Sequence, residues 1–175
     1  EQGNYKVTYV AGTLTITSKV IDKDGKNVEV NSPTDHEYDS KAHKWSPTVT
    51  DKKSKKKLEA GKDYEVSYDK DDFTNVGTIT VTITGKGNYS GTVTRSYKIT
   101  PKSVTVTADN KSKVFGETEP ELTAKVAGTL GNDTVEYTLS RKAGEDVGTY
   151  PITASGKAEQ GNYKVTYVAG TLTIT

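Results

Sequence analysis

An exact internal repeat constrains this chain more than any other feature. The seventeen residues from Glu1 to Thr17 read EQGNYKVTYVAGTLTIT, and the same seventeen return as Glu159 to Thr175, 158 residues later. Chance does not produce an identity of this length. We therefore expect one full period of a tandem array, preceded by the tail of another period. In this interpretation residues 1–17 are the closing hairpin of the preceding repeat.

A second, weaker repeat lies within the 158-residue period. Its matched pairs are Tyr38 with Phe115, Asn75-Val-Gly-Thr78 with Asp146-Val-Gly-Thr149, and Lys98-Ile-Thr100 with Thr173-Ile-Thr175. Because the pairs occur in the same order, they predict two related domains. The expected boundaries are 18–100 and 101–175.

Alternation of apolar and polar residues predicts strands in both domains. The segments with this pattern are Tyr5–Tyr9 and its copy Tyr163–Tyr167, Tyr64–Tyr68, Thr78–Thr84, Val93–Tyr97, Val104–Thr107 and Leu122–Val126. Ala169-Gly170 is predicted to turn the chain, so that Tyr163–Tyr167 and Thr171–Thr175 form a hairpin. We expect an all-β chain of two small tandem β-domains, β-sandwich or β-grasp-like.

The connection Ile99-Thr100-Pro101-Lys102 predicts how these domains are joined. It is short, and Pro101 fixes its own φ while keeping the preceding residue extended. We therefore expect the two domains to be arranged as an extended rod.

Composition excludes several classes of function. The formal net charge is +1, which gives no overall field to attract nucleic acid, and 31% hydrophobic residues leave no apolar run of the length needed for membrane insertion. The chain has no Cys and only two His, His36 and His43. Thiolate chemistry is therefore absent and imidazole chemistry is scarce. We expect no enzyme, no cofactor and no metal site.

Two groups of residues are candidates for ligand binding. Trp45, the only Trp, has the flat ring on which a sugar face stacks, and His43 is close enough to donate a hydrogen bond. Its correspondence with Leu122 favours a core position instead. The run Lys52, Lys53, Lys55, Lys56 and Lys57 could attract anionic glycans. An exposed connection whose lysines keep the domain soluble is the other interpretation, and we favour it.

Two acidic segments suggest cation sites or turns. Asp22-Lys-Asp24-Gly25-Lys-Asn27 is similar to the opening of a calcium loop, but it lacks the Glu expected at the twelfth position. Asp69-Lys-Asp71-Asp72 could hold a cation or form a carboxylate pair. Turns rich in Asp are the favoured interpretation of both.

Residues 101–175 resemble an MBG domain of the YGX type, through VTADNKSKVFGETEPELT, LSRKAGEDVGTYPIT and the ending GNYKVTYVAGTLTIT. Val114-Phe115-Gly116 stands where the family usually has Val-Tyr-Gly, which keeps the ring and loses a hydroxyl. Residues 35–100 are similar to a related tandem repeat of Gram-positive surface proteins. The resemblance supplies no catalytic or ligand residues.

The resemblance implies a location and a class of function. It implies an extracellular, cell-wall-attached, adhesin-like protein of a Gram-positive bacterium, built from tandem β-domains that contact neighbouring repeats. We expect a non-catalytic stalk or adhesion module of the cell surface. The alternative is a carbohydrate- or mucin-binding module, with Trp45, His43 and the Lys52–Lys57 run binding host glycans or mucin.

Overall fold

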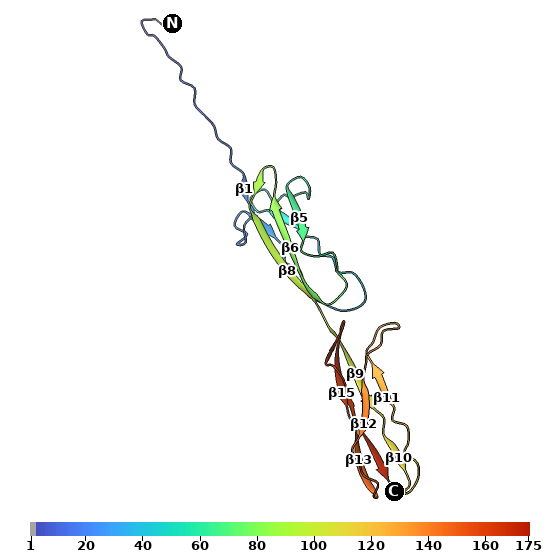
Figure 1. Ribbon diagram of the computed structural model, residues 1–175. Helices are drawn as coiled ribbons and strands as arrows, with labels where there is room; N and C mark the ends of the chain where they lie inside the picture. The colour runs from blue at the N-terminus through green and yellow to red at the C-terminus, as the bar shows by residue number, and fades with distance from the viewer. Residues whose placement is uncertain (1–2) are drawn as a thin grey trace. The chain divides into compact units, whose positions relative to one another are not determined.

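The computed structural model describes residues 3–175, and all their regular structure is β (Figure 1). Eight strands precede the Thr100-Pro101 connection: β1 (Lys19–Val20), β2 (Val28–Val30), β3 (His36–Glu37), β4 (Val49–Asp51), β5 (Tyr64–Tyr68), β6 (Gly77–Gly85), β7 (Tyr89–Ser90) and β8 (Thr92–Thr100). Eight follow it: β9 (Lys102–Ala108), β10 (Lys111–Lys113), β11 (Ala124–Ala127), β12 (Thr138–Arg141), β13 (Gly148–Ser155), β14 (Glu159–Gln160), β15 (Tyr163–Val168) and β16 (Gly170–Ile174). The prediction of an all-β chain of tandem β-domains is confirmed.

Alternation predicts the strands well because each buries one face. The predicted strand Tyr64–Tyr68 coincides with β5, and Thr78–Thr84 lies within β6, where Ile79, Val81 and Ile83 are fully buried. The strand predicted over Leu122–Val126 is found two residues later, as β11. In β6 the apolar positions of the alternating pattern therefore identify the core-facing side chains, whereas in β11 Val126 is 38% exposed.

The sheets on the two sides of Pro101 have matching strand orders. Before it, β3-β8-β6-β5 form one sheet, while β1-β7 and β2-β4 form two small ones. After it, β10-β16-β13-β12 form one sheet and β11-β9-β15-β14 the other. Strand β3 corresponds to β10, and β8 to β16. The weak internal repeat of the sequence thus has a counterpart in strand order.

Residues 101–175 form a sandwich of two four-stranded sheets. Val104 and Val165 face inward from one sheet, and Ile152, Leu172 and Ile174 from the other, each at most 4% exposed. Strand β13 of one sheet packs against β9 and β15 of the other. Of the two architectures expected, this domain is therefore the sandwich.

The predicted hairpin of Tyr163–Tyr167 with Thr171–Thr175 is wrong. Strand β15 pairs with β9 in one sheet and β16 with β10 in the other, both in parallel, at a constant offset from Lys102↔Tyr163 to Lys113↔Ile174. In Figure 1 the chain continues in one direction from β9 to β10, and from β15 to the C-terminus, without reversing. A Cβ on Gly170 would lie 2.6 Å from the Ala108 carbonyl oxygen, so this glycine permits the crossing.

The N-terminal copy of the repeated segment has no such partners. Residues 6–18 form no strand, and every side chain from residue 3 to 18 is exposed. We expect such a leftover copy to pair with an exposed strand edge of 18–100 or to insert into a neighbouring molecule, and residues 6–18 pair with no such edge. Glu1 and Gln2, which belong to the same prediction, lie outside the described residues.

Packing groups the chain into two compact units, each made of several segments. The first contains Glu1–Asn31, Pro47–Ser67 and Thr82–Thr94. The second contains Ser32–Ser46, Tyr68–Val81 and Arg95–Thr175. The end of the 18–100 segment that leads into Pro101 therefore packs as part of the second unit.

Residues 3–175 contain no helix that is long and apolar enough to cross a membrane.

Candidate functional site

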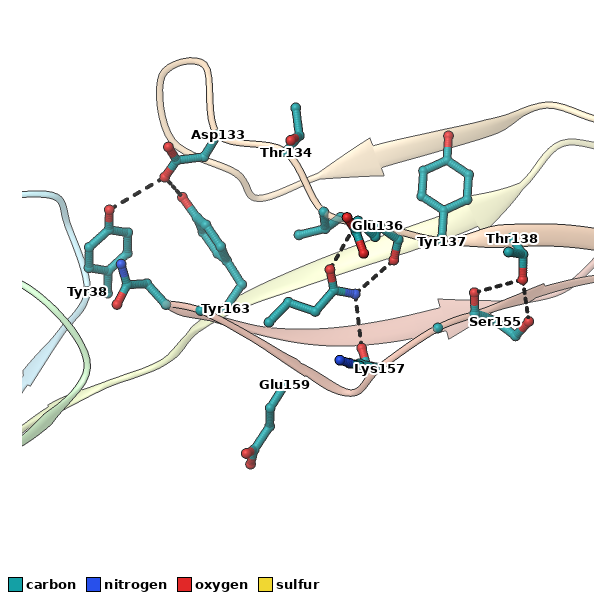
Figure 2. A pocket seen from close by; sticks show the side chains of 15 residues that line it. Tyr38, Asp133, Thr134, Glu136, Tyr137, Thr138, Ser155, Lys157, Glu159 and Tyr163 are labelled. Carbon is teal, nitrogen blue, oxygen red and sulfur yellow. Dashed lines mark hydrogen bonds between the residues drawn. The ribbon is translucent and has the colours of Figure 1, made fainter.

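A large cleft lies within the second unit, beside the connection at Pro101 (Figure 2). Its volume is about 1140 Å³. It is lined by Tyr38, by residues 133–138 between β11 and β12, and by residues 155–157 and 159–163 between β13 and β15. The strand ends thus bring together three segments that are far apart in the sequence.

Two tyrosine hydroxyls meet one carboxylate at the end of the cleft. The hydroxyl of Tyr163 donates to Oδ2 of Asp133 at 2.5 Å, and that of Tyr38 approaches the same oxygen at 3.5 Å. The two rings meet edge to face with centroids 5.6 Å apart. Burial, and then the hydrogen bond to Asp133, raise the pKa of Tyr163. At neutral pH this phenol is therefore a donor, and it holds the 130–133 turn in place.

Asn162 links the same end of the cleft to the loop before β6. Its Oδ1 accepts a hydrogen bond from the backbone N–H of Val76 at 2.9 Å, and its Nδ2 donates to Oδ1 of Asn75 at 2.8 Å. Nearby, the Lys102 ammonium lies 3.0 Å from the Glu37 carboxylate. Polar contacts of this kind fix the connection around Pro101.

Gln160 closes the floor of the cleft. Its Oε1 accepts from the Glu136 N–H at 2.7 Å, and its Nε2 lies within hydrogen-bond distance of the carbonyls of Glu136 and Lys157 and of the Tyr167 hydroxyl. The two hydrogens of Nε2 have three acceptors within reach, so both are used, and Oε1 accepts one bond. Gln160 therefore holds the 133–138 segment against the 157–163 segment.

The solvent-facing groups of the cleft are one ring and charges of both signs. Tyr137 is 36% exposed, and Glu136, Lys157 and Glu159 are exposed. Across residues 3–175, no group of three or more His, Asp or Glu side chains gathers to hold a metal ion.

Trp45 and His43 lie together, as the sequence predicts, but they are built into a cluster of rings. Both are partly exposed. The Tyr97 hydroxyl donates to the His43 carbonyl at 2.6 Å, and the Tyr68 hydroxyl donates to the Trp45 carbonyl at 2.8 Å. The His43 ring stacks on His36 with centroids 4.1 Å apart. The segment is rigidly held, and part of the indole remains open to solvent.

The lysine run forms an exposed connection after β4. Residues 52–57 are all exposed, and the backbone N–H groups of Lys53 and Ser54 donate to Oδ1 of Asp51. The Lys56 ammonium lies 3.7 Å from the Asp63 carboxylate. The run belongs to the first unit, whereas Trp45 and His43 belong to the second. The three candidate elements therefore do not form a single site within one unit.

The two acidic segments are turns. Asp22 accepts the Gly25 N–H through its carbonyl and the Lys26 N–H through its carboxylate, with Gly25 at a φ of 60°. Asp72 accepts the N–H groups of Thr74 and Asn75. Their carboxylates thus have the turn-forming partners that the favoured interpretation requires.

One buried cation supports the loops beside the YGX position. The Lys113 side chain is 5% exposed and its ammonium lies 2.6 Å from Glu145 and 3.2 Å from Glu119. Arg141 also pairs with both carboxylates. The hydrogen bond that the Lys113 ammonium donates to Glu145 is the main cause that raises the pKa of Lys113. This network fixes the loops around Phe115.

Sequence reasoning missed the residues that meet beside Pro101, namely Tyr38, Asn75, Asp133, Asn162 and Tyr163. Tyr38 and Asp133 are 95 residues apart, and no local pattern links them. The available signal was the weak repeat, which matches Tyr38 with Phe115 and so marks both as recurrent positions.

Comparison with known proteins agrees with the resemblance seen in the sequence. Residues 104–173 match the family model described as the MBG domain (YGX type). No curated protein matches the chain. The matched residues run from β9 to β16, which is the two-sheet sandwich described above. Residues 104–173 of this chain are therefore an MBG domain of the YGX type.

Proposed function

We propose that the chain is a non-catalytic repeat module of a bacterial cell-surface protein, and that its repeats form a stalk that supports adhesion. An MBG domain suggests a repeat module of a bacterial surface protein. The finer proposal places the protein outside a Gram-positive cell, attached to the wall, with neighbouring repeats as its principal partners.

One observation carries the proposal. The polar side chains at the end of the cleft engage one another around Pro101: Tyr163 bonds to Asp133, Tyr38 approaches the same carboxylate, and Asn162 bonds to Asn75. In an active site such groups would point at a substrate. Here they fix the connection between two consecutive β-domains, which is what a supporting module needs.

The alternative is a module that binds carbohydrate or mucin. The observation in its favour is the cleft itself, because Tyr137 presents a partly exposed ring beside the exposed Glu136 and Lys157. Partly exposed Trp45 and His43 offer a second surface of the same chemistry. Binding per module would be weak and would increase with copy number.

An experiment on chains with one, two and four copies of the 158-residue period separates the two functions. A supporting module predicts that the longest dimension, from small-angle scattering, increases by a constant amount per copy. It also predicts no binding above background on a dense array of host glycans and mucins. Saturable binding by a single copy that is lost in Tyr137→Ala or Trp45→Ala would establish the alternative.

Cell-surface attachment needs a separate measurement. Intact cells of the source organism should bind an antibody against residues 101–175 and should lose that signal on brief protease treatment. An antigen found only after the cells are lysed would contradict the proposed location.

A further inference from the structure

Phe115 occupies in the MBG domain the position that Tyr38 occupies before Pro101. The Tyr38 N–H donates to the Thr100 carbonyl at 2.9 Å, and the Phe115 N–H donates to the Thr175 carbonyl at 2.8 Å. In each case a short strand, β3 or β10, runs parallel to the last long strand of its domain. The two rings therefore stand at corresponding ends of two related sheets.

The loops beside these rings correspond as well. Val76 precedes β6 and Val147 precedes β13, each within the repeated Asx-Val-Gly-Thr motif. Strands β6 and β13 hold the same place in their sheets. An aromatic residue and a valine thus recur at corresponding positions of the two domains. They are Tyr38 and Val76 before Pro101, and Phe115 and Val147 in the MBG domain.

Only the first pair is covered. Tyr38 is 7% exposed, because it packs on Tyr163, and the Val76 N–H donates to Asn162. Phe115 is 60% exposed and Val147 is 68% exposed. Tyr38 is thus buried and Val76 only partly exposed, whereas Phe115 and Val147 are both largely exposed, which indicates a surface that lacks its partner.

The chain also contains a counterpart of the group that covers Tyr38. The Lys102 N–H donates to the Asn162 carbonyl at 2.9 Å, and Lys102 pairs in parallel with Tyr163. The Lys19 N–H likewise donates to the Asn88 carbonyl at 2.9 Å, and Lys19 pairs in parallel with Tyr89. Asn88-Tyr89 therefore corresponds to Asn162-Tyr163.

The order of the repeat brings these two ends together. Thr17 and Thr175 are the last residues of the two copies of the repeated segment, and Thr17 is followed by Ser18 and Lys19. Where the period recurs, an MBG domain therefore leads directly into a segment like 18–100. The first end that such a segment presents contains Lys19, Asn88 and Tyr89.

A difference in the carboxylate partners matches the loss of the hydroxyl at Phe115. Asp133 accepts from Tyr163 and is approached by the Tyr38 hydroxyl. Its counterpart Asp51 accepts from Tyr89 at 3.2 Å and from the Lys19 ammonium at 2.5 Å. The Lys19 ammonium already donates to Asp51. An aromatic ring packed against this carboxylate therefore needs no hydroxyl donor, so Phe can stand there in place of Tyr.

We propose that Phe115 and Val147 form the docking surface for the Asn88-Tyr89 end of the next copy of the 18–100 segment. The partner is a second copy of this chain's own sequence, joined through Thr175 to Ser18. Docking would repeat, with Phe in place of Tyr, the contacts that Tyr38 and Val76 make with Asn162-Tyr163. The inference rests on the proposed repeat function, and it names the surface through which repeats meet.

The test uses a chain of two periods, residues 1–175 followed by 18–175, with one period isotope-labelled by ligation. The readout is amide hydrogen exchange at Val147, whose equivalent Val76 donates to Asn162. We expect exchange at least tenfold slower in the internal copy than in the last copy. Asn88→Ala in the second period should abolish the difference, whereas Asn88→Ala in the first period should not.

A second readout is thermal stability. Phe115→Ala in the internal copy should lower the melting temperature of the doubled chain by about 4–8 °C, the shift expected for loss of one modest contact in a domain of this size. The same substitution in the last copy should leave it unchanged, which controls for any role of Phe115 inside its own domain. Equal exchange at Val147 in both copies and equal effects of the two substitutions would overturn the docking proposal. Glycan binding by a single copy would instead overturn the proposed function.

Discussion

The chain contains one seventeen-residue sequence in two structural states. In the C-terminal copy Leu172 is 0% exposed and Ile174 is 1% exposed, whereas in the N-terminal copy Leu14 and Ile16 are 86% and 87% exposed. The C-terminal copy forms β14, β15 and β16, while residues 6–18 form no strand. Identical residues therefore make a core in one place and an exposed segment in the other.

Pairing with neighbouring strands, and not local β-preference, makes this segment a strand. Alternating Thr, Val and Tyr favour a β-strand, but a strand forms only when one of its faces is buried against other strands. β15–β16 lies against β9–β10 on one side, and β13 pairs with β16 on the other. The N-terminal copy has the same alternation without these partners, and two strands alone are marginally stable in water.

The strongest test of this comparison is one substitution made in both copies. Leu172→Ala should lower the free energy of unfolding by about 2–5 kcal/mol, because it leaves a cavity between the two sheets. Leu14→Ala should change it by less than about 0.5 kcal/mol. Urea denaturation followed by circular dichroism measures both. Similar losses from the two variants would mean that the N-terminal copy is also packed.

A smaller effect is expected from removing one hydroxyl. Tyr163→Phe should cost about 1–3 kcal/mol, because it removes the donor to Asp133 and the acceptor of the Leu130 N–H. Tyr5→Phe, the matched control, should have no measurable effect, since Tyr5 is 77% exposed. The same denaturation measurement applies. A neutral Tyr163→Phe would show that the bond to Asp133 contributes no net stability.

Alkaline pH should weaken the folded chain through its buried phenols. Burial raises the pKa values of Tyr89, Tyr97 and Tyr163 above their ordinary value of 10.0. The unfolded chain then loses these protons first, so it binds fewer protons than the folded chain and stability falls as pH rises from about 10. Melting temperatures between pH 8 and 11 measure the decline. Tyr163→Phe should make it shallower, whereas Tyr5→Phe should leave it unchanged.

The smallest effect concerns exchange between molecules. Residues 1–17 of one molecule can replace residues 159–175 of another with identical side-chain contacts, which would give head-to-tail chains. The resident copy is tethered, and its effective concentration reaches the millimolar range, so exchange should be slight. Light scattering at rising concentration should show a mass increase that disappears when residues 1–17 are deleted. Equal masses for the two chains at every concentration would rule out exchange.

Part of this fold could be predicted from the sequence because burial leaves a local pattern. Alternation located β5 and the core face of β6. The sheet to which a strand belongs leaves no such pattern, so the sequence predicts a turn at Ala169-Gly170 although the chain passes straight from one sheet to the other. Glycine at this point provides close approach to Ala108, and a sequence does not distinguish that use from a turn.

The candidate site shows the same division between local and distant signals. Local composition placed the lysine run in an exposed connection and put Trp45 beside His43. The meeting of Tyr38 with Asp133 depends on strand ends 95 residues apart.

The expected extended rod also stays a prediction. A radius of gyration near 16 Å, the value for a compact chain of this length, would contradict it.

The parallel run of β9–β10 beside β15–β16 has a consequence for how the MBG domain bears force. The chain enters at Lys102, at the start of the first run, and leaves after Ile174, at the end of the second. Since the runs are parallel neighbours, tension between the two ends slides one along the other and loads the whole hydrogen-bond ladder together. In a hairpin, the same tension would open the bonds one after another. Forced unfolding is governed by the barrier to unfolding, and a ladder loaded in shear makes that barrier high for a given number of bonds.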